Sequence, residues 1–230
     1  MVLCPISLGV PVERINSVDA VLSFIEIPAS SSPIIRYPLR MRRILDSRYF
    51  LWLLLTLPGA VTVIAYINGE TFYGEVVHFT GELSARLLIV AMALAPLQLM
   101  FPGRRWIGWL IQRRRYFGVA AFGYAALHSG VYVARKGLFE GVLAEAAEPG
   151  ILAGWLAFAV FIPLAITSND WAIRRLKRWW KRIHRWVYAA AVLTFVHWLL
   201  IAFDIVPGLI HLLVLGALEG YRIWRKRTSQ

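Results

Sequence analysis

The sequence predicts an all-α membrane protein, a six-transmembrane-helix bundle with both termini in the cytoplasm. Of its 230 residues, 59% are hydrophobic, whereas soluble globular proteins are about 45–50% apolar. The apolar residues form six runs, and a membrane span needs roughly 20 mostly apolar residues. The basic residues gather in alternate segments between those runs, as they do in proteins that cross a membrane several times.

The six predicted spans occupy most of the chain after residue 48. Pro58, Pro96 and Pro163 fall within spans, where a transmembrane helix tolerates proline when neighbouring helices satisfy the freed carbonyl groups. The spans run near Tyr49–Ile67, Leu83–Phe101, Tyr116–Val133, Gly150–Thr167, Ile183–Phe203 and Ile205–Trp224.

Charge in the connecting segments predicts the orientation. Positive residues mark the cytoplasmic side of a membrane, and an even number of spans then places both termini inside. The alternation agrees with six spans at every loop. The basic segments contain Arg36, Arg40, Arg42, Arg43 and Arg48; Arg104, Arg105, Arg113, Arg114 and Arg115; Arg174, Arg175, Lys177, Arg178, Lys181, Arg182 and Arg185; and Arg222, Arg225, Lys226 and Arg227. The other segments contain Glu70, Glu75 and Glu82; Glu140, Glu145 and Glu148 with Arg135 and Lys136; and Asp204.

The formal net charge of +12 has three explanations: nucleic-acid binding, a basic tail, or topology signals in a membrane protein. The short arginine clusters between apolar runs favour the third, since nucleic-acid binders normally carry a basic stripe on a soluble fold. Cys4 is the only cysteine, so no disulfide or Cys-ligated metal cluster can form within one chain. We find no glycine-rich phosphate loop, and expect any nucleotide to be handled by another protein.

Residues 1–44 form a predicted N-terminal extension. They contain prolines and serines without sustained periodicity, and their arginines follow the apolar stretches, which is the reverse of a secretory signal. We expect this extension to be disordered or to result from the choice of start codon. Met41-Arg42-Arg43 directly precedes the first span, as in many proteins of the bacterial inner membrane. The membrane domain then comprises residues 45–227, and we expect a multi-pass protein of that membrane.

Two histidines are predicted to share one depth in the bilayer. Ionisable groups within spans are rare and usually functional. His128 lies 13 residues beyond Arg115, and His197 lies 13 residues beyond His184, so each is roughly 20 Å from the cytoplasmic end of its span. Two such imidazoles on neighbouring helices can ligate a haem iron from both sides. The alternative is two separate polar residues, each hydrogen-bonded to a neighbouring helix, and the residues alone leave both open.

His184 marks the cytoplasmic mouth of the fifth span. On a straight helix it points some 140° away from His197, and the matching depth on the third span holds Arg114 or Arg115 instead of a histidine. His184 therefore ligates a second haem with an unidentified partner, contacts a cytoplasmic electron donor, or snorkels among the arginines at the interface.

Three further residues lie near the outer side. Arg86 is suited to a haem propionate, although snorkelling to the lipid headgroups explains it equally well. Taken alone, His78, before the second span, and His211, in the sixth, are better explained as structural residues than as ligands.

Several short motifs occur in order along residues 45–227. They are His78-Phe79-Thr80-Gly81 with Arg86; Arg114-Arg115 with Gly118; Ala126-Leu127-His128; Thr167-Ser168; Ile183-His184-Arg185 with Val187-Tyr188; and His197-Trp198. In this order and spacing, the chain resembles the membrane haem subunit of the bacterial periplasmic methionine-sulfoxide reductase system, within the wider group of ferric-reductase-like transmembrane domains.

This resemblance implies a transmembrane b-type cytochrome. It implies one or two haem b groups with His128, His184 and His197 as iron ligands, His78 and Arg86 as further cofactor-binding residues, and FMN as an additional cofactor. It also implies electron transfer from a cytoplasmic flavin reductase or the quinone pool to a periplasmic molybdopterin-containing methionine-sulfoxide reductase.

Two other functions stay open. A self-standing ferric or quinone reductase would use another acceptor, but the sequence lacks the fused flavin and nicotinamide domain that such enzymes normally carry. A transporter without a cofactor predicts polar groups at the midplane and broken helices, and the spans contain few acidic residues.

Overall fold

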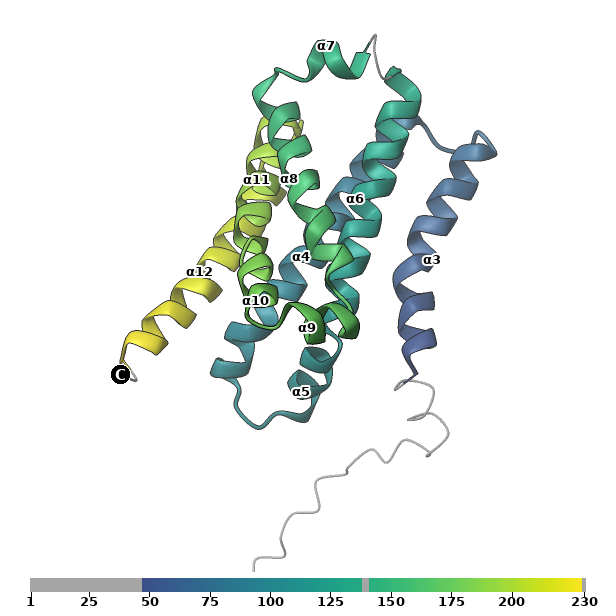
Figure 1. The fold of residues 1–230 in the computed structure, drawn as a ribbon. Helices are drawn as coiled ribbons and strands as arrows, with labels where there is room; N and C mark the ends of the chain where they lie inside the picture. The colour runs from purple at the N-terminus through teal and green to yellow at the C-terminus, as the bar shows by residue number, and fades with distance from the viewer. Residues whose placement is uncertain (1–46, 138–140, 229–230) are drawn as a thin grey trace, which may run out of the picture. The chain divides into compact units, whose positions relative to one another are not determined.

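The computed structural model of the chain describes residues 47–137 and 141–228. The predicted extension, residues 1–44, lies outside the described residues. Within the described residues, six helical segments are long and apolar enough to cross a membrane. This confirms the all-α fold and the predicted number of spans (Figure 1). They are α3 (Arg48–Ile67), α4 (Tyr73–Met100), α6 (Arg114–Lys136), α8 (Pro149–Ile166), α10 (Arg178–His184) together with α11 (Val187–Ile201), and α12 (Val206–Thr228).

Two helix pairs form the centre of the bundle. Helix α4 packs most extensively against α6, and α8 packs against α11, while α12 lies along α4. The hydroxyl of Ser84 on α4 donates a hydrogen bond to the carbonyl of Ala121 on α6 at 2.8 Å. Small residues at such contacts let two backbones approach closely, and close packing drives helix association in lipid. The buried core includes Leu88, Met92, Ala120, Ala121, Phe161, Ala190 and Ala191.

The buried hydroxyl of Tyr124 on α6 makes two hydrogen bonds to the backbone of α3. Pro58 interrupts α3 because it has no N–H. At the next residue, the N–H of Gly59 donates to the hydroxyl of Tyr124 at 2.9 Å, and this hydroxyl donates to the carbonyl of Leu55 at 2.8 Å. A regular α-helix would pair these two backbone groups directly, so Tyr124 bridges the hydrogen-bond ladder of α3 beside the proline.

Helix α4 begins ten residues before the predicted start at Leu83. The carboxylate of Glu75 accepts a hydrogen bond from the N–H of Phe72 at 3.4 Å, which caps the first turn. His78 and Glu82 then follow at a spacing of four residues, on one face of the helix. These polar residues concealed the start of the helix, and His78 lies within α4 instead of before it.

The fifth span is not a straight helix. Helix α10 ends at His184 and α11 begins at Val187, so two residues separate them. The angle of 140° expected between His184 and His197 applies only to a continuous helix. Because the helix is interrupted between these two residues, that angle does not describe their relative direction.

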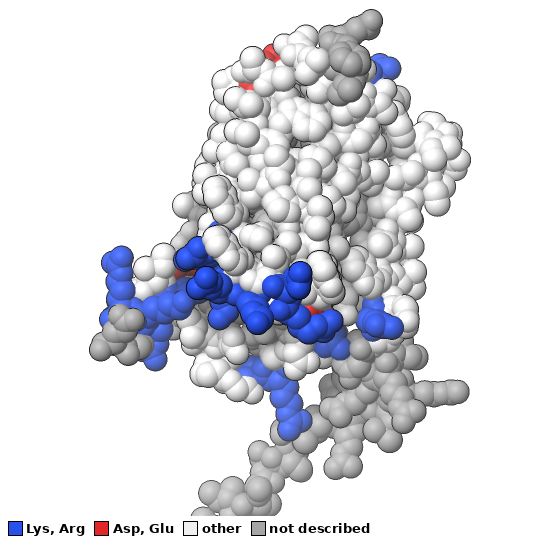
Figure 2. Space-filling model, in the orientation of Figure 1, with Lys and Arg blue, Asp and Glu red and all other residues white. Residues whose placement is uncertain are grey.

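Charge differs between the two ends of the bundle. Figure 2 shows Lys and Arg gathered around the end that holds the short helices α5 (Arg105–Gln112) and α9 (Asp170–Leu176), together with α10. We call this the basic end. The opposite end holds the connection between α6 and α8, which includes α7 (Leu143–Glu145), and the connections that precede α4 and α12.

Candidate haem-binding site

A cavity of about 280 Å³ lies among α4, α6, α8 and α11, toward the end opposite the basic end. Ligand pockets in proteins begin near 300 Å³ and have mainly apolar and aromatic walls with a few polar groups. The apolar and aromatic lining includes Ile151, Trp155, Phe158, Phe161, Trp198 and Ile201. The lining therefore suits a largely apolar ligand, and the volume is close to the lower limit of ligand pockets.

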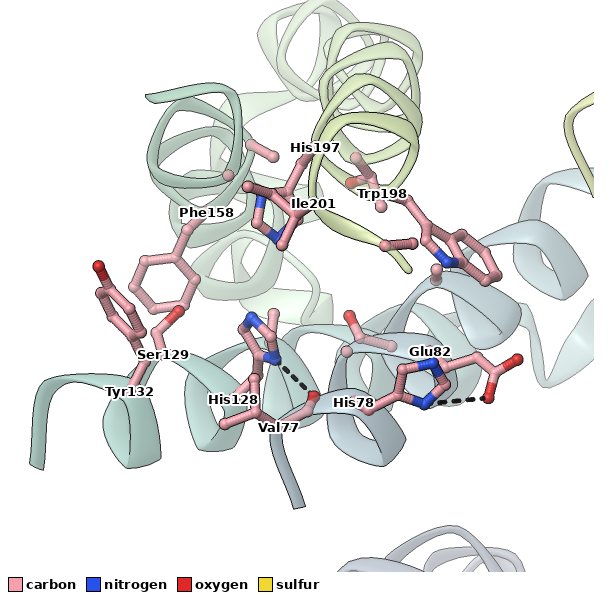
Figure 3. A pocket seen from close by; sticks show the side chains of 18 of the residues that line it. Val77, His78, Glu82, His128, Ser129, Tyr132, Phe158, His197, Trp198 and Ile201 are labelled. Carbon is pink, nitrogen blue, oxygen red and sulfur yellow. Dashed lines mark hydrogen bonds and ion pairs between the residues drawn. The ribbon is translucent and has the colours of Figure 1, made fainter. Parts of the chain in front are cut away.

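His128 and His197 face each other across this cavity. Figure 3 shows their imidazoles pointing toward one another from α6 and α11. The ring centroids are 6.0 Å apart, and the ring planes are nearly perpendicular, at 86°. The two histidines that the sequence places at equal depth therefore lie next to each other in the structure.

Each of these imidazoles is held by a backbone carbonyl of another helix. The Nδ1 atom of His128 donates to the carbonyl of Val77 on α4 at 2.9 Å, and that of His197 donates to the carbonyl of Gly150 on α8 at 2.8 Å. A carbonyl can only accept a hydrogen bond, so the proton lies on Nδ1 in both rings. Nε2 then carries a free lone pair in both, which is the state that ligates a metal ion.

Glycines make room for both rings. A Cβ atom on Gly81 would lie 3.0 Å from Nδ1 of His128, and one on Gly154 would lie 2.7 Å from Nδ1 of His197. Carbon atoms in contact prefer about 3.5 Å or more. Any residue larger than glycine would therefore push the imidazole away at these two positions.

The pair fits a haem iron. With metal–nitrogen bonds of about 2.0 Å, as for histidine on zinc, two imidazoles on opposite sides of one metal ion have their centroids roughly 6 Å apart. Among the described residues, no group of three or more His, Cys, Asp and Glu side chains is placed to hold a metal ion. Haem needs only two axial ligands from the protein. The hydroxyl of Thr194, which lines the cavity, makes no hydrogen bond within the described part of the chain.

His78 and Arg86 meet at Glu82. Nδ1 of His78 lies 4.0 Å from the Glu82 carboxylate, and the Arg86 guanidinium contacts the same carboxylate at 2.5 Å. His78 and Glu82 line the cavity (Figure 3), whereas Arg86 lies one turn further along α4. Of the two predicted residues, His78 therefore lies at the cavity wall, and Arg86 is connected to the wall through its ion pair with Glu82.

Another acidic residue is bonded to a side chain that lines the cavity. The Glu145 carboxylate, in α7, accepts hydrogen bonds from the Lys136 ammonium at 2.5 Å and from the Tyr132 hydroxyl at 2.8 Å. Both hydrogen bonds lower the pKa of the Glu145 carboxyl, that of Lys136 more strongly. Because Tyr132 also lines the cavity, Glu145 ties the α6–α8 connection to the cavity wall.

His184 lies at the other end of α8. Its Nε2 is 3.1 Å from the hydroxyl of Thr167, and its ring is stacked on Trp180 with centroids 4.1 Å apart. Trp180 in turn donates from its indole N–H to the carbonyl of Thr167 at 3.0 Å. His211 is not among the residues that line the cavity: its Nδ1 is bound to the carbonyl of Pro207 in its own helix, and its ring lies 5.4 Å from that of Trp198, which does line the cavity.

The family model described as "Ferric reductase like transmembrane component" matches residues 80–195, from α4 into α11. The chain belongs to this family. The match to the ferric-reductase-like family includes His128 and His184 and ends two residues before His197.

Curated relatives of this ferric-reductase-like chain have a more specific name. The chain is 34% identical over 160 residues to the protein-methionine-sulfoxide reductase heme-binding subunit MsrQ of Xanthomonas axonopodis pv. citri, which covers 68% of this chain and 72% of that relative. It is 33% identical over 157 residues to the subunit of the same name from Rhizobium meliloti, with 66% and 70% covered. No solved structure matches the chain.

Several residues of the candidate site in this ferric-reductase-like chain escaped sequence reasoning. The carbonyls of Val77 and Gly150 carry no sequence signal, because any residue provides a carbonyl. Gly154 lay within a predicted span, where glycine costs about 1 kcal/mol relative to alanine, but Gly123 and Gly130 share that signal without any crowding. Gly81 preceded the predicted start of its span at Leu83, so this cost did not mark it, although it belongs to the motif His78-Phe79-Thr80-Gly81.

Proposed function

We propose that the chain is a transmembrane b-type cytochrome that passes electrons from a cytoplasmic flavin reductase or a quinol to a periplasmic molybdopterin-containing methionine-sulfoxide reductase. The observation that carries this proposal is the facing pair of His128 and His197. Haem b supplies one-electron chemistry when bound, because its iron changes between ferric and ferrous. His128 and His197 would hold the haem iron through Nε2, with the tautomer of each ring fixed by its carbonyl partner, in a largely apolar cavity.

The basic end is the cytoplasmic end in this proposal, since positive residues mark the cytoplasmic side of a membrane. The cavity then lies toward the periplasm of a bacterial inner membrane. An electron that leaves the cavity emerges on the side where the proposed acceptor resides. The relatives are named subunits of a protein-methionine-sulfoxide reductase, which supports this choice of acceptor.

His184 serves the input of electrons in this proposal. A second bis-histidine haem needs a second histidine beside His184, and among the described residues its ring instead meets Thr167 and Trp180. This arrangement favours contact with a cytoplasmic donor, or with FMN, over ligation of a second haem. Electrons must cross a hydrocarbon core of roughly 30 Å, so a group near His184 shortens the path to the cavity.

The proposal is tested with the purified full chain. A pyridine haemochrome assay, combined with a protein-concentration measurement, is expected to give haem b at one per chain. After reduction by a flavin reductase with a nicotinamide donor, addition of the periplasmic reductase and a methionine-sulfoxide substrate is expected to reoxidise it. A colourless protein contradicts the proposal. Reoxidation by a ferric chelate or a quinone, but not by the periplasmic enzyme, supports the alternative of a self-standing reductase.

A further inference from the structure

Gly81 and Gly154 occupy equivalent positions in the two central helix pairs. On α4, the carbonyl of Val77 binds His128, and Gly81 follows four residues later. On α8, the carbonyl of Gly150 binds His197, and Gly154 again follows four residues later. In an α-helix the carbonyl of one residue faces the N–H of the residue four positions on. Each glycine therefore lies where an imidazole must pass to reach that carbonyl.

The clearance at these glycines is small and unequal. The Cβ of an alanine would lie 3.0 Å from Nδ1 and 3.1 Å from Cε1 of His128 at position 81, but 2.7 Å and 2.9 Å from the same atoms of His197 at position 154. Because non-bonded carbon atoms prefer about 3.5 Å, alanine displaces the ring from the carbonyl in both cases. The displacement required is larger at Gly154.

Several other helical glycines have no neighbour at the position of a Cβ atom. Gly123 and Gly130, on the same helix as His128, have open space within 4 Å of a Cβ position. Gly59 and Gly150 are also crowded, but by Tyr124 at 2.9 Å and by Ile201 at 2.6 Å. Among the described helical glycines, close approach of an imidazole is therefore confined to Gly81 and Gly154.

We propose that Gly81 and Gly154 are positioning residues for the haem ligands, one for each axial histidine. The missing Cβ lets each imidazole reach a carbonyl of the partner helix, and this hydrogen bond turns Nε2 toward the cavity. A hydrogen bond from Nδ1–H to a carbonyl also makes the imidazole a stronger electron donor, which favours ferric over ferrous iron. Loss of that bond raises the midpoint potential. The inference rests on the proposed function, because it assigns the purpose of these glycines to a haem held by His128 and His197.

The test compares the full-length wild type with Gly81→Ala, Gly154→Ala and the control Gly123→Ala. Apoprotein is titrated with haem to measure affinity, and the loaded protein is examined by ferric EPR and by equilibrium redox titration. Gly123→Ala is expected to match the wild type. Gly81→Ala is expected to keep haem with an altered low-spin EPR signal and a higher midpoint potential. Gly154→Ala is expected to lose about 10-fold or more in haem affinity, as when a partner of a metal-bound histidine is lost.

The outcomes separate this inference from the proposed function. Wild-type haem affinity, EPR signal and midpoint potential in both Gly81→Ala and Gly154→Ala overturn the positioning role and leave the proposed function intact. A wild-type chain that binds no haem overturns both. Far-UV circular dichroism reports whether each variant folds. If Gly154→Ala does not fold, Gly81→Ala decides, because its contact is milder. A wild-type midpoint potential in Gly81→Ala then overturns the positioning role, and a raised midpoint potential supports it.

Discussion

The imidazole of His128 lies 6.0 Å from that of His197, centroid to centroid, with the two ring planes nearly at right angles. We expect His128→Ala or His197→Ala to abolish or strongly weaken the reduced α-band, because each leaves one axial position without a ligand. His184→Ala is the matched control, since His184 lies at the opposite end of α8, and it should keep the band. Optical spectra of the three purified variants provide the measurement. A full low-spin spectrum in His128→Ala refutes the ligand assignment and makes His78 or His211 the candidate.

His184 is expected to affect the rate at which the haem is reduced, and not the binding of the haem proposed between His128 and His197. His184→Ala removes the ring that stacks on Trp180 and contacts Thr167, so the proposed cytoplasmic donor loses its contact. Stopped-flow reduction by a flavin reductase should become slower, whereas reduction by dithionite should be unchanged. Equal rates with the flavin reductase in wild type and variant would show that electrons enter elsewhere. Loss of half the haem would instead identify a second haem at His184.

Both termini are expected to lie in the cytoplasm, because Lys and Arg gather around the basic end on the face that Figure 2 shows, and positive residues mark the cytoplasmic side. A reporter enzyme that is active only in the periplasm should be inactive when fused after Gln230. The same reporter should be active when fused after Gly69, in the connection between α3 and α4. Activity after Gln230 combined with inactivity after Gly69 would invert the topology and place the cavity toward the cytoplasm.

Tyr124→Phe is expected to destabilise the protein by about 1–2 kcal/mol without changing its haem spectrum. The hydroxyl bridges the N–H of Gly59 and the carbonyl of Leu55, and buried backbone groups without partners are costly, even though interhelical hydrogen bonds in membranes are individually modest. Thermal unfolding in detergent measures the loss. Tyr116→Phe is the control, because the Tyr116 hydroxyl makes no hydrogen bond within the described residues, and its ring contact with Trp52 is kept. Equal stability of the two variants would show that the bridge contributes nothing.

The α6–α8 connection is expected to loosen at low pH. The pKa of the Glu145 carboxyl is below its ordinary value of 4.5, mainly through Lys136. A group with a depressed pKa stabilises the folded state fully above its ordinary pKa, and the contribution is lost as the pH falls through the lowered value. Hydrogen–deuterium exchange at α7, corrected for intrinsic rates, should therefore increase below about pH 4.5. Glu145→Gln should show fast exchange at neutral pH with little further change on acidification. Unchanged exchange in that variant contradicts the role of Glu145.

The sequence by itself determined the membrane character and the number of spans, and it predicted that His128 and His197 lie at one depth. These features depend on local properties: an apolar run of sufficient length is stable in lipid wherever it occurs, and equal distance from a basic boundary places two residues at equal depth. His128 and His197 could therefore be placed at the same depth before the structure was known, but that their rings face each other is a finding of the structure. Helix starts were less accessible, because the polar residues His78 and Glu82 belong to a helix whose other faces are apolar.

Only the tertiary structure decided which backbone atoms hold the two imidazoles and which polar groups share a site. The carbonyls of Val77 and Gly150 are chemically identical to all others, and they became partners of His128 and His197 only through the pairing of α4 with α6 and of α8 with α11. The bridge made by Tyr124 depends in the same way on α3 lying against α6. The physical reason is that hydropathy records the preference of each residue for lipid or water, whereas close approach between two helices depends on the shapes of both.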